Sequence, residues 1–275
     1  MLSYRHAFHA GNYADVLKHL ILVKSFEYML QKPAPIMYID THSGAGRYPF
    51  DNSMSQKTNE YAEGAGALRA EHLPESFTAY GELLESFASE RVYPGSPLIA
   101  AKMLRREDKL RMFELHPSDF SKLEKLFARD RRARVEQSDG HKGLKGLLPA
   151  QQKRALILMD PSFEVKREYQ EAVTSIAEGY KRMPGATFLL WYPVVQRDQI
   201  DRMIQQLRRS KIKNIWQFEL GVAADSTEYG MTASGVIAIN PAWVLPKAME
   251  ELLPALQQQL APEGGHYKVE NLVAE

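Results

Sequence analysis

The chain of 275 residues contains no cysteine, and this absence excludes disulfide bonds, thiolate zinc sites and any reaction that needs a cysteine nucleophile. It also lacks an apolar run long enough to cross a membrane. Its first residues carry Arg5, His6 and His9 in place of the apolar segment of a signal peptide. We therefore expect a cytoplasmic protein with no membrane partner.

An excess of charge of one sign is missing as well. The chain has 35 lysines and arginines against 34 aspartates and glutamates, for a formal net charge of +1. A nucleic-acid partner would then be bound by local basic clusters. Two such clusters occur, RDRRAR at 129–134 and RRSKIKN at 208–214. Either one alone is typical of solvated surface, so the charge pattern leaves this kind of partner open.

Short apolar runs alternate with amphipathic stretches through most of the chain. The expected strands are 35–40, 109–115, 132–137, 154–160, 186–192, 213–220 and 234–240. The expected helices include 15–30, which begins after the N-cap residue Asn12, and 117–130, 169–182 and 196–209. This alternation predicts an α/β fold with a mostly parallel, seven-stranded sheet. The loop between the last two strands is too short for a crossover helix, so we expect these strands to pair antiparallel.

Residues 47–93 interrupt this alternation. Two helix-like stretches follow each other there without a strand, at 60–70 and 74–88. We therefore predict a helical insertion subdomain at 47–93, at the rim of a Rossmann-like domain formed by 1–46 and 94–275. Ser96 is expected to cap the helix that follows the insertion.

The carboxyl ends of the strands are the informative places, because ligands bind there in open parallel sheets. The first strand is followed by DTHSGAGRY, in which Gly44 and Gly46 allow a tight turn close to a ligand. Pro49 stands where the dinucleotide fingerprint requires a third glycine, and this disfavours a nicotinamide cofactor. The loop still suits a ligand that carries a nucleoside.

Acidic residues follow the next two strands. Glu114 could accept hydrogen bonds from both ribose hydroxyls, although the insertion places it farther from the glycines than the usual spacing of about 20 residues. Asp139, followed by Gly140, could bind an adenine amine, or the pair could form a common turn. Three successive strand ends thus carry residues suited to a nucleoside.

The stretch LILMDPSFE at 156–164 runs from a buried strand directly into Asp160. Pro161 favours extended backbone at the residue before it, so the carboxylate is held at the tip of the strand. Asp160 could merely cap the next helix. We favour a base site, because Phe163 can stack on a flipped base while Asp160 and the Pro161 carbonyl accept hydrogen bonds from its exocyclic amine.

These residues resemble the amino-methyltransferases that use S-adenosylmethionine, whose pattern after the fourth strand is Asp, Asn or Ser followed by two prolines and an aromatic residue. Nearly the whole chain is similar to the RlmJ family of 23S ribosomal RNA adenine methyltransferases. The similar stretches include MLSYRHAFHAGNYADVLKH, DTHSGAGRY, YPGSP, ELHPSD, ALILMDPSFE, LWYPVV and GMTASG. Ser162 replaces the family's second proline and Phe163 its tyrosine, so stacking is retained and a looser loop is expected.

The resemblance implies a Rossmann-like methyltransferase fold and methyl transfer from S-adenosylmethionine to the exocyclic amine (N6) of an adenine in 23S rRNA. By position, the family's cofactor contacts correspond to His19, His42, Ser96, Glu114, Asp139, Gly140 and Asp160. Asp160 would also be the catalytic residue. The residues expected at the substrate are Tyr4, His6, Lys18, Pro161 and Phe163.

Some of these residues could have roles outside the active site. His6 and His9 have no thiolate or carboxylate beside them in the sequence and make a poor metal site, so no metal is expected. Lys18 could face solvent only, since the apolar side chains of its helix are Val16, Leu17, Leu20 and Ile21.

Other activities also remain open. The amine could belong to a DNA adenine or cytosine, or to a protein glutamine. A non-catalytic RNA-binding module is disfavoured by the intact Asp160, and an oxidoreductase with a nicotinamide cofactor by Pro49 and Asp160. We expect a monomer that acts on naked 23S rRNA or an early assembly intermediate, with the insertion contacting RNA and not the cofactor.

Overall fold

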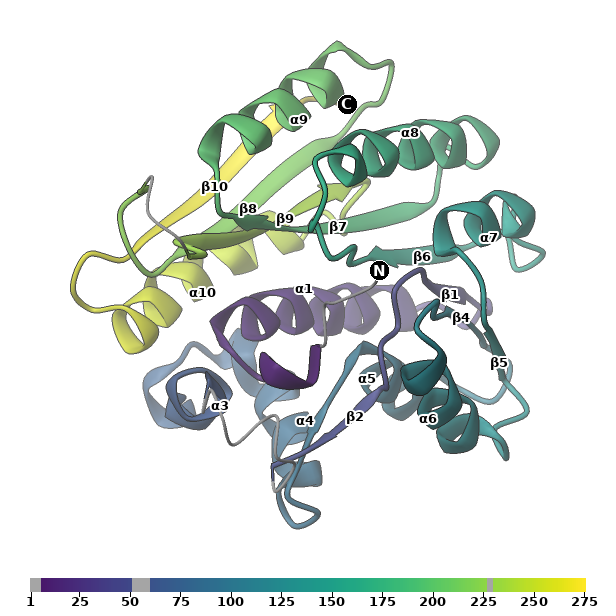
Figure 1. The fold of residues 1–275 in the computed structure, drawn as a ribbon, viewed down its shortest axis with the longest axis horizontal. Helices are drawn as coiled ribbons and strands as arrows, with labels where there is room; N and C mark the ends of the chain where they lie inside the picture. Colours follow the sequence, from purple (N-terminus) through teal and green to yellow (C-terminus); the bar gives the residue numbers. More distant parts are fainter. Residues whose placement is uncertain (1–5, 51–59, 227–229) are drawn as a thin grey trace.

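The computed structural model describes residues 6–50, 60–226 and 230–275, built around one eight-stranded sheet. Its strands are β1 Met37–Asp40, β4 Lys109–Phe113, β5 Ala133–Glu136, β6 Ala155–Met159, β7 Thr187–Val194, β8 Ile215–Gly221, β9 Ala233–Ile239 and β10 His266–Val273. They lie in the order β10-β8-β9-β7-β6-β1-β4-β5 (Figure 1). The strands from β7 to β5 in this order run parallel, while β9 pairs antiparallel with β7 and β8. The mostly parallel sheet and the antiparallel pairing of the predicted last two strands are confirmed.

The expectation of seven strands is wrong, because β10 is an eighth. It pairs antiparallel with β8 at the edge of the sheet. Its sequence HYKVENLV mixes polar and apolar residues, and Leu272 is its one buried residue. Such a half-exposed edge strand is held mainly by its backbone pairing with the neighbouring strand. Its sequence therefore lacks the apolar pattern from which a strand is predicted.

Helices cover both faces of the sheet (Figure 1). One face carries α1 Tyr13–Leu30, α5 Ser96–Met103, α6 Pro117–Phe127 and α10 Leu245–Leu260, and the other carries α7 Gly140–Leu147, α8 Arg167–Arg182 and α9 Arg197–Arg209. The buried apolar side chains form one cluster on each face. In the described part of the chain, no helix combines the length and the apolar character needed to cross a membrane.

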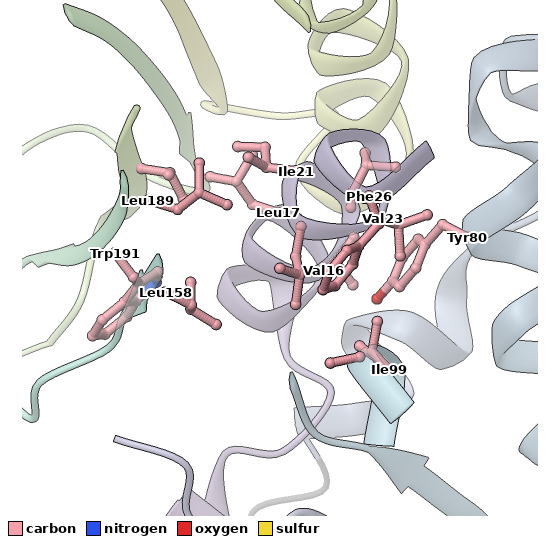
Figure 2. Packing of buried hydrophobic residues seen from close by; sticks show 14 of the residues in the cluster. Val16, Leu17, Ile21, Val23, Phe26, Tyr80, Ile99, Leu158, Leu189 and Trp191 are labelled. Atoms are coloured by element: carbon pink, nitrogen blue, oxygen red, sulfur yellow. The ribbon is translucent and has the colours of Figure 1, made fainter. Parts of the chain in front are cut away.

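The helix α1 is central to the first face and begins as predicted. Its N-cap is Asn12, whose side-chain oxygen accepts a hydrogen bond from the backbone N–H of Asp15 at 3.0 Å. Leu17 is directed toward Leu189 of β7 (Figure 2). Because elements from distant parts of the chain surround this helix, Lys18 is only 3% exposed. The alternative that Lys18 faces solvent is therefore wrong.

The segment 47–93 contains the helix predicted at 74–88, as the 3-10 turn Glu75–Phe77 followed by α4 Thr78–Ala88. The expectation that the segment lacks strands is wrong. Its two ends, β2 Arg47–Pro49 and β3 Val92–Pro94, pair antiparallel as a separate two-stranded sheet. Its standing as a subdomain stays a prediction.

The helix predicted at 60–70 is much shorter in the structure. It consists of α3 Glu60–Glu63, and the 3-10 turns Ala65–Ala67 and Ala70–His72 follow. Gly64 ends α3 because the backbone passes very close to the start of α1. A Cβ at Gly64 would lie 2.1 Å from the carbonyl oxygen of Gly11, and the N–H of Ala65 donates to that same oxygen at 2.8 Å. A tertiary contact has overridden the local helical pattern.

Candidate active site

The carboxyl ends of β1, β4, β5 and β6 meet at one cavity of about 270 Å³, as the strand-end argument predicts. The predicted site residues that line it are His6, Lys18, His19, His42, Ser96, Glu114, Asp139, Gly140 and Asp160. We call it the strand-end cavity. Tyr48 and Gly44 also line it. Because Tyr48 belongs to 47–93, the expectation that this segment stays away from the cofactor site is not supported by the geometry.

Glu114 lies directly after β4 and holds the glycine turn that follows β1. Its Oε2 accepts a hydrogen bond from the N–H of Gly44 at 2.8 Å, and its Oε1 accepts one from the N–H of His116 at 2.6 Å. Gly44 has a φ of 59° and Gly46 a φ of 73°, a region that favours glycine. Burial raises the pKa of Glu114, and the two backbone hydrogen bonds partly oppose that shift.

Asp139 and Gly140 lie at the start of α7, where they line the strand-end cavity. Asp139 is the N-cap, and its Oδ1 accepts hydrogen bonds from the N–H groups of His141 and Lys142 at 2.9 and 3.4 Å. A Cβ at Gly140 would lie 2.0 Å from the carbonyl oxygen of Thr41. Only glycine therefore fits between α7 and the loop after β1.

Two imidazoles at the strand-end cavity, the buried His19 and the half-buried His42, have strongly lowered pKa values. Burial lowers the pKa of His19 to about 3 and outweighs the opposing effect of Asp15. Burial and the neighbouring His141 lower the pKa of His42 to about 3. One ring nitrogen of His19, Nδ1, lies 2.7 Å from the hydroxyl oxygen of Tyr93. Its Nε2 is buried and has no hydrogen-bond partner among the described residues.

Ser96 lines the strand-end cavity, but its expected role as a helix cap is wrong. Gly95 occupies the N-cap position of α5, and Ser96 is the first helical residue. The Ser96 hydroxyl donates to Oδ2 of Asp40 at 2.7 Å, and the Tyr38 hydroxyl donates to the same oxygen at 2.8 Å. Burial raises the pKa of Asp40, and these two hydrogen bonds act in the opposite direction.

Lys18 bridges two carboxylates from distant parts of the chain. Its Nζ lies 2.7 Å from Oδ1 of Asp15 and 2.5 Å from Oδ2 of Asp160. Burial alone would lower the pKa of Lys18, but the two carboxylates outweigh burial and raise it. Oδ2 of Asp15 also accepts hydrogen bonds from Nε2 of His6 at 3.0 Å and from the N–H of Gly11 at 2.8 Å. The N-terminal stretch, α1 and the tip of β6 are thereby joined through the buried side chains of Asp15 and Lys18.

Asp15 is the main site residue that the sequence reading missed. Its position three residues before Lys18 on the same helix was an available signal, because residues with this spacing are neighbours on a helix surface. The reading of Asp160 as a helix cap is wrong. The next helix, α8, begins at Arg167, and its N-cap residue is Lys166.

A second cavity, of about 510 Å³, lies on the other side of Asp160, and we call it the aromatic cavity. Phe163, Trp191 and Tyr13 line it. The residues that line both cavities are His6, Lys18, Asp160 and Ser162. Phe163 is therefore brought next to Asp160, but on the side away from the strand ends.

The remaining predicted residues are placed less directly. Pro161 is buried in the turn after β6 and lines neither cavity. Tyr4 lies outside the described residues. His9, which the sequence reading weighed as a metal ligand, pairs through Nδ1 with Oε1 of Glu60 at 2.8 Å. Across residues 6–50, 60–226 and 230–275, no group of three or more His, Asp or Glu side chains is arranged to hold a metal ion.

The model of the family described as "Ribosomal RNA large subunit methyltransferase D, RlmJ" matches residues 33–273. The chain is 48% identical to the ribosomal RNA large subunit methyltransferase J of Escherichia coli (strain K12) and 44% identical to that of Haemophilus influenzae, over all of each chain. A crystal structure of a Legionella pneumophila protein matches with a TM-score of 0.89 at 34% identity and covers 96% of this chain and 98% of that one. This chain belongs to the RlmJ family of ribosomal RNA large subunit methyltransferases.

Proposed function

We propose that this protein transfers a methyl group from S-adenosylmethionine to the exocyclic amine of an adenine in 23S rRNA. The observation that carries the proposal is the meeting of two cavities at one carboxylate. The strand-end cavity suits a nucleoside cofactor, the aromatic cavity suits a base, and Asp160 lies at their junction. Family membership supports ribosomal RNA as the substrate.

The strand-end cavity fits S-adenosylmethionine on three observations. Glu114 presents a carboxylate that is already held in place by backbone N–H groups, as ribose recognition requires. Gly140 lets the backbone approach closely where a side chain would clash. His19 carries a buried Nε2 without a partner in the described chain, which a polar group of the cofactor would satisfy. When bound there, the cofactor supplies an electrophilic methyl group on a cationic sulfur.

The residues around Asp160 would orient the incoming amine. Lys18 holds Oδ2 of Asp160, so Oδ1 would accept a hydrogen bond from the amine. An adenine amine is a weak nucleophile because its lone pair is delocalised into the ring. A fixed, charged acceptor favours a pyramidal nitrogen and aims its lone pair at the methyl group, so Asp160 and Lys18 would act by positioning and electrostatics.

The aromatic cavity would receive the target base after it leaves the RNA stack. Phe163 lies at its wall, with Trp191 close behind at a ring-centroid distance of 6.2 Å. His6 lines both cavities and would lie beside the substrate. A free or early-assembly RNA is the substrate we propose, because the base must be accessible for flipping.

The nature of the methylated product tests the proposal directly. Incubation of purified protein with labelled S-adenosylmethionine and unmodified 23S rRNA is expected to yield N6-methyladenosine at one position, identified by mass spectrometry of nuclease fragments. Incorporation only into DNA, into protein or at a cytosine would contradict it.

Glu114→Ala is expected to weaken S-adenosylmethionine binding by about 2–3 kcal/mol, because charge-assisted hydrogen bonds to the ribose are lost. Loosening of the Gly44 turn acts in the same direction. Titration calorimetry measures this change, and Glu124→Ala, at an exposed position of α6, is the matched control. Unchanged affinity would show that Glu114 does not contact the cofactor.

Asp160→Asn is expected to lower single-turnover methyl transfer by about 100-fold or more, because an oriented charged acceptor becomes a neutral amide. The fold and the cofactor affinity should change much less, and calorimetry in parallel separates chemistry from binding. Asp201→Asn, on the exposed side of α9, is the control. Transfer near the parent rate would remove Asp160 from the mechanism.

Phe163→Ala is expected to weaken RNA engagement by about 1–3 kcal/mol, which is the usual contribution of one stacked base. Phe163→Tyr keeps the aromatic face and should retain the parent behaviour. The dependence of single-turnover transfer on RNA concentration measures the effect. A loss in the tyrosine variant as large as in the alanine variant would argue against stacking.

A further inference from the structure

Phe163 has an unusual backbone conformation for a large side chain. Its φ is 52°, in the left-handed region that residues other than glycine adopt only where the surroundings impose it. This conformation directs the ring into the aromatic cavity beside Asp160. Something in the loop between β6 and α8 must therefore hold the backbone at this position.

The ring of Phe163 and the loop residues around it are held by two adjacent residues in the first turn of α8. The ring packs against Tyr169, with 4.4 Å between the ring centroids. The carboxylate of Glu168 contacts the loop on both sides of Phe163. The Ser162 hydroxyl donates to Oε1 and Oε2 of Glu168 at 3.1 and 3.3 Å, and the N–H of Val165 donates to Oε2 at 3.4 Å.

Position 162 is where this chain departs from the two-proline pattern that it otherwise resembles. A proline restricts the loop by fixing its own φ, whereas serine leaves more conformations available. The serine hydroxyl, however, makes a hydrogen bond that proline cannot make. The contact with Glu168 thus restrains the loop where the ring of a second proline is absent.

We propose that Glu168 is a positioning residue for methyl transfer, which acts through Ser162 to hold Phe163 in its left-handed conformation. Ser162 lines both cavities, and Glu168 lies at the wall of the strand-end cavity, so this contact is placed to couple the start of α8 to the base site. The inference rests on the proposed stacking role of Phe163. The sequence predicts a looser loop at Ser162, whereas the inference gives Ser162 a hydrogen-bond partner, Glu168, that restrains the loop.

A double-mutant cycle tests the inference. Single-turnover transfer to 23S rRNA is measured against RNA concentration for the parent, Ser162→Ala, Glu168→Ala and the double variant. Each single change is expected to lower kcat/KM by about three- to tenfold, as for loss of one hydrogen bond, chiefly through KM for the RNA. The double variant should be within about twofold of Glu168→Ala, because both changes break the same contact.

Ser162→Pro provides the rescue. It restores the proline restraint, so it should keep close to the parent activity and recover most of the rate lost in Glu168→Ala. Glu178→Ala is the matched control on the same helix, since it removes only an exposed ion pair with Lys145. Because Ser162 and Glu168 also line the strand-end cavity, calorimetry measures cofactor affinity in parallel, and a loss confined to cofactor affinity would overturn the inference.

Two further results would overturn the inference. One is a Glu168→Ala protein whose kcat/KM equals that of the parent. The other is a Glu168→Ala change that lowers kcat/KM by the same factor in the parent and in the Ser162→Ala variant. If Ser162→Pro does not fold, the cycle with alanine decides the question alone. Phe163→Ala in the same assay separates the two proposals. If Phe163→Ala leaves kcat/KM unchanged, the stacking role itself is refuted. If Phe163→Ala lowers kcat/KM while the effects of the Glu168 and Ser162 changes are additive, only the contact proposed here is refuted.

Discussion

The buried ion pairs of Lys18 are the constraint on which the rest of the site depends. An ammonium that is 3% exposed must keep its partners, because an unpaired buried charge costs several kcal/mol. One partner, Asp15, lies on the same helix, and the other, Asp160, lies at the tip of β6. Together they hold α1 against the loop after β6. The distance between these elements determines where the strand-end cavity and the aromatic cavity meet.

The segment 47–93 helps to make this arrangement possible by enclosing α1. Glu60 accepts a hydrogen bond from Nδ2 of Asn12 at 2.9 Å, so the first residue of α3 is tied to the N-cap of α1. At the end of the segment, the Tyr93 hydroxyl contacts His19. A helix that packed only on the sheet would leave one side in water. Here both sides are covered, and consecutive polar residues such as Lys18 and His19 are buried at the cavity.

The far wall of the aromatic cavity is held by a second buried polar network. Trp191 and Tyr192 follow each other on β7, so they point to opposite faces of the sheet. The Tyr192 hydroxyl donates to Oε2 of Glu219 at 2.8 Å, and Arg197 pairs with both carboxylate oxygens of Glu219. Burial alone would raise the pKa of Glu219, but Arg197 and Tyr192 outweigh burial and lower it. The strand is thus fixed on one face by charge, and on the other face Trp191 lines the aromatic cavity.

The sequence by itself determined the alternation of strands and helices, the N-cap of α1 and the strand-end positions of Glu114, Asp139 and Asp160. These features follow from hydrophobic periods and turn chemistry, which act between residues near one another in the chain. Only the tertiary structure decided the burial of Lys18, the pairing of the edge strand β10 and the end of α3 at Gly64. Each of these depends on a partner at least several tens of residues away. Such a long-range contact produces no pattern among neighbouring residues from which it could be predicted.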